Sequence, residues 1–326
     1  MSELTERPPL GIRLLRALQK EPDWQAMRAE ELVAFREAVN RKRASRLARL
    51  VSGFPDRDAV IQWQEAALPG RGLRVRVYRP SPGQAGGRDD LPLVLHVHGG
   101  GFVGTAVQSD WVNSHLAARL PAVVVSVEHR LLDQETPLAA IVDDAWDTLR
   151  HVVQHAARWG IDPARTAVFG ESTGAMVTAL AAIRAREHGL LLRAQVLVNA
   201  AVDLTSTGFE HASMRRHADS PTLTMPQMRL FQRLAVPPGT DPRALSPACA
   251  DDLSGLAPAL VVVPTLDPVA DHGRCYAERL RAAGTPARLT EYHGATHAFL
   301  SMPGLVPQAR AARAEIAEFL REALAR

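Results

Sequence analysis

One serine of the chain lies between two glycines, in the segment F-G-E-S-T-G-A at residues 169–175. An apolar run precedes this segment and a helical pattern follows it, so the serine lies at a strand-to-helix turn. A β-carbon at Gly170 or Gly174 would collide with the adjacent strand or helix in so tight a turn. We expect the turn to expose the hydroxyl of Ser172 at a helix N-terminus, where the helix dipole favours developing negative charge. This environment suits a nucleophilic serine.

Candidates for the base and the acid that such a serine needs lie downstream of it. Asp267 lies at the end of the strand-like run A-L-V-V-V-P-T, in T-L-D-P-V-A-D, and His297 follows the last strand-like run, in Y-H-G-A-T-H-A-F. Both side chains should therefore lie at the carboxyl edge of the sheet, together with Ser172. Asp271 is an alternative acid, although we expect it to cap the next helix. His293 is an alternative base, although we expect it to close the turn after the strand, so Asp267 and His297 are preferred.

A glycine-rich stretch supplies candidates for the third part of such a site. Residues 96–102 read H-V-H-G-G-G-F and begin at the end of a predicted strand. Backbone N–H groups of glycines can approach a substrate oxygen closely because no side chain intervenes. We expect Gly99 and Gly100 to donate to the oxyanion that forms when the serine attacks a carbonyl, with the amide of Thr173 as a third donor.

The other histidines and the two cysteines do not suggest a metal centre. His96 and His98 share one face of a predicted strand, but no third ligand stands at a plausible spacing. His151 and His155, in H-V-V-Q-H, lack the glutamate of the H-E-x-x-H zinc motif, and we assign them to a helix surface. The cysteines have no metal-ligand spacing and are too few for a disulfide framework. We therefore predict neither a metal ion nor an organic cofactor.

Strand-like runs alternate with helical patterns after residue 58. The continuous apolar runs at 93–97 and 122–127 are typical of central parallel strands that are covered on both faces. This alternation predicts an α/β fold with a mostly parallel, doubly wound sheet. The predicted strands are 59–63, 73–78, 93–97, 122–127, 166–170, 194–198, 259–263 and 287–292, and the predicted helices are 138–159, 173–187, 271–283 and 308–325.

Two segments do not fit this alternation and are expected to form a helical cap over one end of the sheet. They are residues 1–55, which have helical periodicity, and residues 204–236, which are irregular and partly helical. The catalytic core would then comprise residues 56–203 and 237–326. The residues that we expect to line the acyl pocket are Trp24, Phe35, Met214, Met225 and Phe231.

Composition excludes several classes of protein. The chain has 326 residues, is 46% hydrophobic and has a net charge of +3. Its densest basic run, at residues 41–43, belongs to an amphipathic helical pattern, so we expect a solvated face and no nucleic-acid partner. No apolar window approaches the ~18 residues of a membrane helix, and the N-terminal residues lack the order of a secretory signal. We predict a cytoplasmic protein without stable membrane insertion, in which an edge strand at 287–292 could pair two subunits as a homodimer.

These motifs together resemble those of the hormone-sensitive-lipase-like carboxylesterases in the α/β-hydrolase superfamily. The resemblance covers roughly residues 72–325, with the motifs in the order typical of that superfamily. It implies an α/β-hydrolase fold whose cap is built from N-terminal helices and an insert after the sixth strand. The segments that carry it are VRVYRP (75–80), HGGGF (98–102), HRL (129–131), GIDPARTAVFGESTG (160–174), LDPVAD (266–271) and HAF (297–299).

The chain departs from the family pattern close to the serine. Thr173 and Ala175 replace an alanine and a glycine, and Glu171 replaces the usual Asp or Thr. A β-branched threonine beside the nucleophile could narrow the pocket or shift the third oxyanion donor. In the loop 129–135, a histidine replaces the tyrosine of the family motif Y-R-L-A-P-E, and we expect Arg130 to be structural. These changes indicate a divergent member that keeps every catalytic part.

The resemblance implies a serine carboxylesterase that hydrolyses short- to medium-chain esters. Ser172, His297 and Asp267 would form its catalytic triad, and the substrate would be a small molecule. The same triad could instead cleave an amide or a lactone. A third possibility is a non-catalytic small-molecule-binding protein on the same fold, which is less favoured because such relatives lose the histidine that this chain retains.

Overall fold

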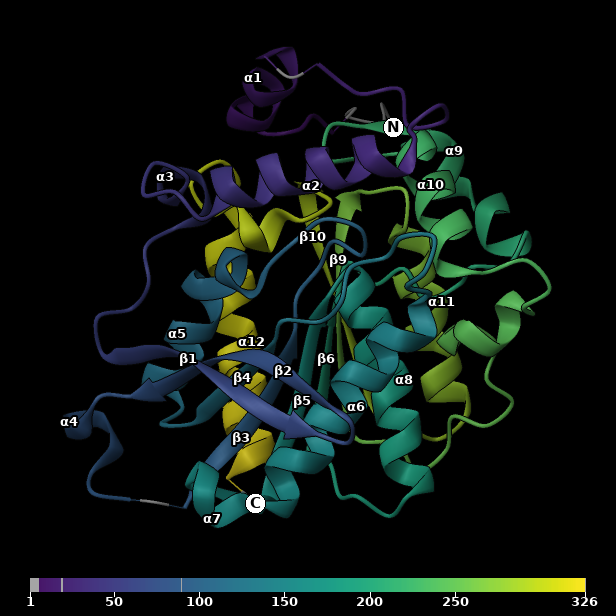
Figure 1. Cartoon of the computed structure of the whole chain (residues 1–326). Helices are drawn as coiled ribbons and strands as arrows, with labels where there is room; N and C mark the ends of the chain where they lie inside the picture. The colour runs from purple at the N-terminus through teal and green to yellow at the C-terminus, as the bar shows by residue number, and fades with distance from the viewer. Residues whose placement is uncertain (1–5, 19, 89, 326) are drawn as a thin grey trace, which may run out of the picture.

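Eight strands form one central sheet in the computed structural model, which describes residues 6–18, 20–88 and 90–325 (Figure 1). The strand order is β1-β2-β4-β3-β5-β6-β9-β10; β2 is antiparallel to β1 and β4, and the other neighbours are parallel. The predicted α/β fold with a mostly parallel sheet is confirmed. The strands are β1 (Ala59–Leu68), β2 (Arg71–Pro80), β3 (Leu91–Val97), β4 (Val123–Val127), β5 (Ile161–Glu171), β6 (Ala194–Val198), β9 (Ala259–Leu266) and β10 (Ala287–Thr296).

Helices connect the strands and cover both faces of the sheet (Figure 1). The helix predicted at 173–187 has those bounds, whereas the helix predicted at 138–159 is interrupted at His155. Within the described ranges, no helix is both long and apolar enough to cross a membrane. The helices are α1 (Leu10–Leu18), α2 (Ala29–Arg43), α3 (Arg49–Ser52), α4 (Pro82–Ala85), α5 (Asp110–Arg119), α6 (Leu138–Gln154), α7 (Ala156–Trp159), α8 (Thr173–Glu187), α9 (Ala212–Arg216), α10 (Met225–Ala235), α11 (Ala270–Ala282) and α12 (Gln308–Leu324).

Successive side chains along each strand point to opposite faces of the sheet and pack in two separate hydrophobic layers. In β3, Val94 packs with residues of α5 and α12 on one face, whereas Leu93 and Leu95 pack with residues of α6 and α8 on the other. Because both faces are covered, the central strands are apolar at nearly every position. Functional side chains are therefore displayed at the carboxyl edge of the sheet, where strands give way to loops and helices.

The two segments expected to form a cap pack against each other at that edge (Figure 1). Trp24 contacts Phe35 of α2 edge to face, with ring centroids 5.1 Å apart, and lies 5.8 Å from Phe102 of the glycine-rich loop. Met214 and Phe231 of the second segment belong to the same buried cluster. In this second segment the short strands β7 (Asp219–Ser220) and β8 (Leu223–Thr224) pair with each other, outside the central sheet.

Because three histidines are buried, we expect the free energy of unfolding to decrease at acidic pH. Burial lowers the pKa of His96, His98 and His272 below the usual 6.5. Below pH 6.5 the unfolded chain therefore binds protons that the folded chain excludes, and the free energy of unfolding falls as the pH decreases. The slope reaches about 1.4 kcal/mol per pH unit for each ring. We expect the urea midpoint of unfolding to decrease as the pH falls from about 7.5 to about 5.5.

A matched variant isolates one of these rings. Nε2 of His272 is 3.0 Å from the carbonyl oxygen of Gly208, a bond that a glutamine amide can also make. The His272→Gln protein should therefore show a weaker pH dependence of the urea midpoint than the wild type. An identical dependence in both proteins would show that His272 does not contribute.

Candidate active site

Ser172 lies in a strained turn between β5 and α8. Its φ of 55° is in the left-handed region, which few non-glycine residues adopt. The backbone N–H of Ser172 donates to the carbonyl oxygen of Val198 at 2.9 Å, which fastens the turn to β6. A β-carbon at Gly170 would overlap the carbonyl oxygen of Gly174, and one at Gly174 would overlap that of Val97. Close backbone packing thus requires both glycines.

Asp267, His297 and Ser172 form a continuous hydrogen-bonded chain. Nε2 of His297 is 2.7 Å from Oγ of Ser172, and Nδ1 of the same ring is 2.8 Å from Oδ2 of Asp267. The other oxygen of Asp267 accepts the backbone N–H of Val269 at 3.0 Å, which fixes the orientation of the carboxylate. Asp267 and His297 are buried, and Ser172 is partly exposed. The carboxyl ends of β5, β9 and β10 bring the three side chains together.

The alternative acid and the alternative base have other partners. Oδ2 of Asp271 accepts the backbone N–H of Ser213 at 2.8 Å, and Oδ1 accepts from Arg274 at 2.7 Å. The expectation that Asp271 caps α11 is wrong, because the N-cap is Val269 and Asp271 lies inside the first turn of the helix. His293 faces Glu6 at 2.7 Å on the exposed surface. The expectation that His293 closes the turn after the last strand is wrong, because β10 extends beyond it.

The glycine-rich loop after β3 lies directly against Ser172. A β-carbon at Gly99 would be 3.0 Å from the carbonyl oxygen of Glu171 and 3.4 Å from Cβ of Ser172. Gly100 has a φ of +88°, which favours glycine. Within the described part of the chain, the backbone N–H groups of Gly99, Gly100 and Thr173 bind no acceptor. These groups are therefore free to donate to an oxygen atom beside Ser172.

Asn199, which the sequence analysis did not identify, also reaches His297. This residue follows β6, is buried and has a φ of 40°. Its side-chain nitrogen is 3.3 Å from Nε2 of His297, the atom that also faces Ser172. Its backbone N–H donates to the carbonyl oxygen of Val262 at 2.8 Å, which holds it at the sheet edge. A polar residue at the carboxyl end of a parallel strand is the signal that could have identified it.

Glu171 joins three loops around the site. Its buried carboxylate accepts hydrogen bonds from the hydroxyls of Ser109 at 3.2 Å and Ser301 at 2.9 Å. Nε2 of His96 is 3.6 Å from the same carboxylate. Ser109 lies in the 3₁₀-helix η1 (Ala106–Ser109), beyond the glycine-rich loop, and Ser301 lies in the 3₁₀-helix η5 (Phe299–Ser301), beyond β10. This departure from the family pattern therefore braces the turn that carries the serine.

Two further histidines near the glycine-rich loop, His98 and His129, contact each other. The rings of His98 and His129 stack, with centroids 4.0 Å apart. In the described ranges, no group of three or more potential ligands could hold a metal ion.

The assignment of His151 to a helix surface is wrong. This residue is buried because α7 brings Trp159 to within 6.1 Å of it, measured between ring centroids.

The loop 129–135 supports the glycine-rich loop despite its altered sequence. The backbone N–H of Leu132 donates to the carbonyl oxygen of Gly101 at 2.7 Å. Arg130 binds the buried carboxylate of Asp144 in α6 through two guanidinium nitrogens, at 3.0 and 2.9 Å. Arg130 is therefore structural, as expected.

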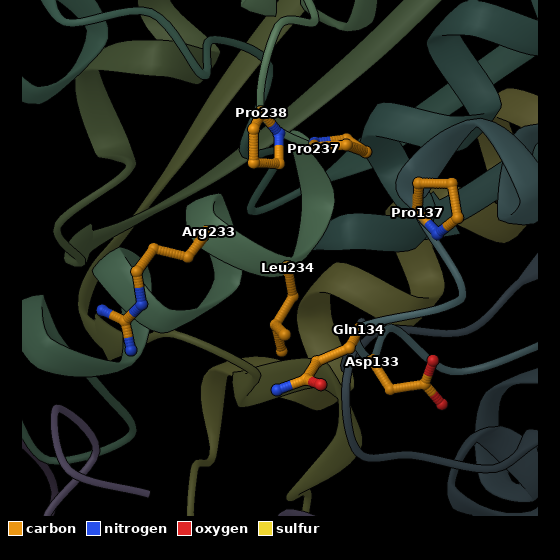
Figure 2. A pocket seen from close by; sticks show the side chains of 7 residues that line it. All are labelled: Asp133, Gln134, Pro137, Arg233, Leu234, Pro237 and Pro238. Atoms are coloured by element: carbon orange, nitrogen blue, oxygen red, sulfur yellow. The ribbon is translucent and has the colours of Figure 1, made fainter. Parts of the chain in front are cut away.

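A small cavity of about 180 Å³ lies beside this loop, at the edge of the cap (Figure 2). Figure 2 shows that Asp133 and Gln134 line it from the loop, while Leu234 lines it from α10. Neither Ser172 nor His297 lines this cavity, so it is separate from the hydrogen-bonded chain described above.

Comparison with known proteins identifies the family. A family model described as alpha/beta hydrolase fold matches residues 94–301. The carboxylesterase NlhH of Mycobacterium tuberculosis is 36% identical over 77% of this chain and 79% of its own length. The chain belongs to the hormone-sensitive-lipase-like carboxylesterase family of α/β-hydrolases. The family that the sequence motifs resembled is thereby confirmed.

Two further proteins that are similar to this chain support the same conclusion. An ethyl acetate hydrolase of Pseudomonas putida is 32% identical over 87% of this chain and 89% of its own length. The structure of an ester hydrolase from the metagenome of Lake Arreo superimposes with a TM-score of 0.85 and 30% identity, over 97% of this chain and 98% of that one. The chain described here is therefore a carboxylic ester hydrolase of the serine type.

Proposed function

We propose that this hydrolase cleaves short- to medium-chain carboxylic esters through an acyl-enzyme on Ser172. The observation that carries the proposal is the hydrogen-bonded chain from Asp267 through His297 to Ser172, with distances of 2.8 and 2.7 Å. A nucleophile, a base and an orienting acid in this order are the side chains that catalyse acyl transfer to water in serine hydrolases.

In the first step, Oγ of Ser172 attacks the ester carbonyl carbon while Nε2 of His297 accepts the hydroxyl proton. The neutral ring must carry its own proton on Nδ1 to do this. The carboxylate of Asp267, 2.8 Å away, favours that tautomer and then stabilises the imidazolium that forms. Burial of Asp267 and His297 strengthens this interaction because water is excluded.

The negative charge on the carbonyl oxygen is proposed to be stabilised by the amides of Gly99, Gly100 and Thr173. These groups belong to a loop and a helix N-terminus that are already in place, so little reorganisation is needed as the charge develops. Thr173 would donate through its backbone N–H, which binds no acceptor in the described part of the chain.

The second half of the reaction repeats the first with water as the nucleophile. The imidazolium of His297 gives its proton to the departing alkoxide, which leaves as the alcohol. His297 then accepts a proton from water as its oxygen attacks the acyl-enzyme. Collapse of the second tetrahedral intermediate releases the carboxylic acid and returns the proton to Ser172.

The acyl chain is proposed to lie between the glycine-rich loop and the cap. The cap packs closely on this loop, since a β-carbon at Gly101 would be 2.6 Å from the ring of Phe231. Such close packing leaves little room for a long acyl chain, and the name of the ethyl acetate hydrolase supports a short one. The residues proposed to line the pocket are Trp24, Phe35, Met214, Met225 and Phe231.

A series of p-nitrophenyl esters from acetate to dodecanoate tests this proposal. We expect the highest kcat/KM for acyl chains of about eight carbons or fewer and a steep decline for longer chains, because longer chains would have to displace the packed cap. A maximum at dodecanoate would contradict the proposed pocket. Hydrolysis of matched anilides but not of esters would instead favour an amide substrate.

No observation favours the amide, lactone or non-catalytic alternatives over ester hydrolysis. The proposed cap, formed by residues 1–55 and 204–236, is supported by the buried cluster that Trp24 and Phe231 share. The cytoplasmic location and the homodimer remain predictions. The dimer would use β10, which lies at the edge of the sheet.

A further inference from the structure

The peptide between Gly99 and Gly100 is held from its carbonyl side by two side chains. The carbonyl oxygen of Gly99 lies 2.9 Å from Nδ1 of His98 and 3.0 Å from Nε2 of Gln108. In a trans peptide the C=O and the following N–H point in opposite directions. Fixing the carbonyl of Gly99 therefore fixes the direction of the N–H of Gly100, one of the proposed oxyanion donors.

Gln108 is itself held by a residue of the cap. Its side-chain oxygen accepts from a guanidinium nitrogen of Arg43 at 2.8 Å. Arg43 is the last residue of α2, and no carboxylate of the described residues lies within ion-pair distance of it. Arg43 is partly buried, and this burial lowers the pKa of its guanidinium group. A positive charge on the oxygen side of the Gln108 amide also strengthens the bond that its nitrogen donates.

A second contact ties the same helix to the same loop. The side-chain nitrogen of Asn40, one turn before Arg43, donates to the carbonyl oxygen of Gly104 at 3.0 Å. Gly104 lies close to Gly99, since a β-carbon at Gly104 would be 2.5 Å from the Gly99 carbonyl oxygen. The C-terminal turn of α2 is thus connected to the surroundings of the Gly99 carbonyl in two ways. Asn40 binds Gly104 beside it, and Arg43 binds Gln108, which donates to it.

We propose that Arg43 and Gln108 are positioning residues that hold the Gly99–Gly100 peptide with its N–H directed at the oxyanion. The relay runs from the Arg43 guanidinium through the Gln108 amide to the Gly99 carbonyl. It rests on the proposed ester hydrolysis at Ser172. Because the relay acts on a donor that is needed when charge develops, its loss should lower kcat and leave KM nearly unchanged.

The substitution Gln108→Glu tests the relay with little change in shape. The carboxylate can keep the contact with Arg43, but it cannot donate to the Gly99 carbonyl and repels that oxygen. We expect kcat for p-nitrophenyl butyrate to fall about tenfold, less than the ~10²–10³ lost when an oxyanion donor itself is removed, with KM within about twofold. Inhibition by a trifluoromethyl ketone, which forms an oxyanion on the serine, should weaken by about the same factor. The matched control is Gln154→Glu, on the exposed end of α6.

Arg43 is tested in the same way. Arg43→Gln should lower kcat less than Gln108→Glu does, because the Gln108 amide can still reach the carbonyl without its support. The double variant should lose less than the product of the two single effects, since both act through one peptide. If the variants and the wild type have the same urea midpoint of unfolding, the decrease in kcat cannot be due to a loss of folded protein.

The relay is overturned if Gln108→Glu keeps the wild-type kcat and ketone affinity, or if it changes KM alone. Failure of the proposed function would look different, because wild type and Ser172→Ala would then turn over esters equally. In that case the rate at which an organophosphonate modifies Ser172 still reports on the relay, since its P=O oxygen must occupy the same position. An unchanged labelling rate in Gln108→Glu would then reject it.

Discussion

The Ser172→Ala protein should hydrolyse p-nitrophenyl butyrate roughly 10⁴- to 10⁶-fold more slowly than the wild type. Alanine removes the atom that forms the acyl-enzyme, while the backbone turn and its hydrogen bond to Val198 can remain. The residual rate would come from substrate binding and oxyanion stabilisation alone. Initial rates at saturating substrate, with active sites counted by organophosphonate titration of the wild type, measure the effect.

The matched control for this experiment is Ser254→Ala, which removes an exposed hydroxyl away from the site. It should retain the wild-type rate. If Ser172→Ala also keeps a rate within tenfold of the wild type, Ser172 is not the nucleophile. Mass spectrometry after organophosphonate treatment provides an independent readout, because the adduct should be absent from Ser172→Ala and present in Ser254→Ala.

Asp267→Asn should lower kcat by roughly 10³- to 10⁴-fold. An asparagine can present its N–H₂ group to Nδ1 of His297, which favours the tautomer with the proton on Nε2, and such a ring cannot accept the proton of Ser172. The imidazolium also loses its counter-charge. Steady-state kinetics at several pH values measure kcat separately from substrate binding.

Asp271→Asn is the matched control because the two aspartates are four residues apart and were the two candidate acids. Its carboxylate binds Ser213 and Arg274, so the variant should lose some stability but keep kcat within a few fold. A larger loss of kcat in Asp271→Asn than in Asp267→Asn would transfer the role of the acid to Asp271.

The sequence predicted the parts of this molecule that repeat a pattern or follow a general rule. Central strands and the helix at 173–187 were recognisable from continuous or periodic apolar residues. Asp267 and His297 could be selected because carboxyl ends of parallel strands meet at one edge. The glycines around Ser172 were informative because close backbone packing leaves no room for a side chain.

Features that depend on single long-range contacts could not be predicted. The position of Asn199 after an apolar strand could have placed it at the carboxyl edge of the sheet, but its contact with His297, 98 positions away, could not be predicted. His151 appeared exposed because the turn at residue 155 that returns Trp159 to it has no sequence signal. Contacts such as Arg43 with Gln108 join a cap helix to a loop 65 positions away, where periodicity carries no information.

The contact between His297 and Ser172 joins residues 125 positions apart, and β10 is the last strand of the chain. During synthesis, the nucleophile, its turn and the glycine-rich loop leave the ribosome long before the histidine does. A nascent chain that still lacks β10 also lacks His297, the proposed base, whatever part of the sheet it has formed. In the proposed mechanism, the chain therefore becomes competent for catalysis only after β10 has joined the sheet.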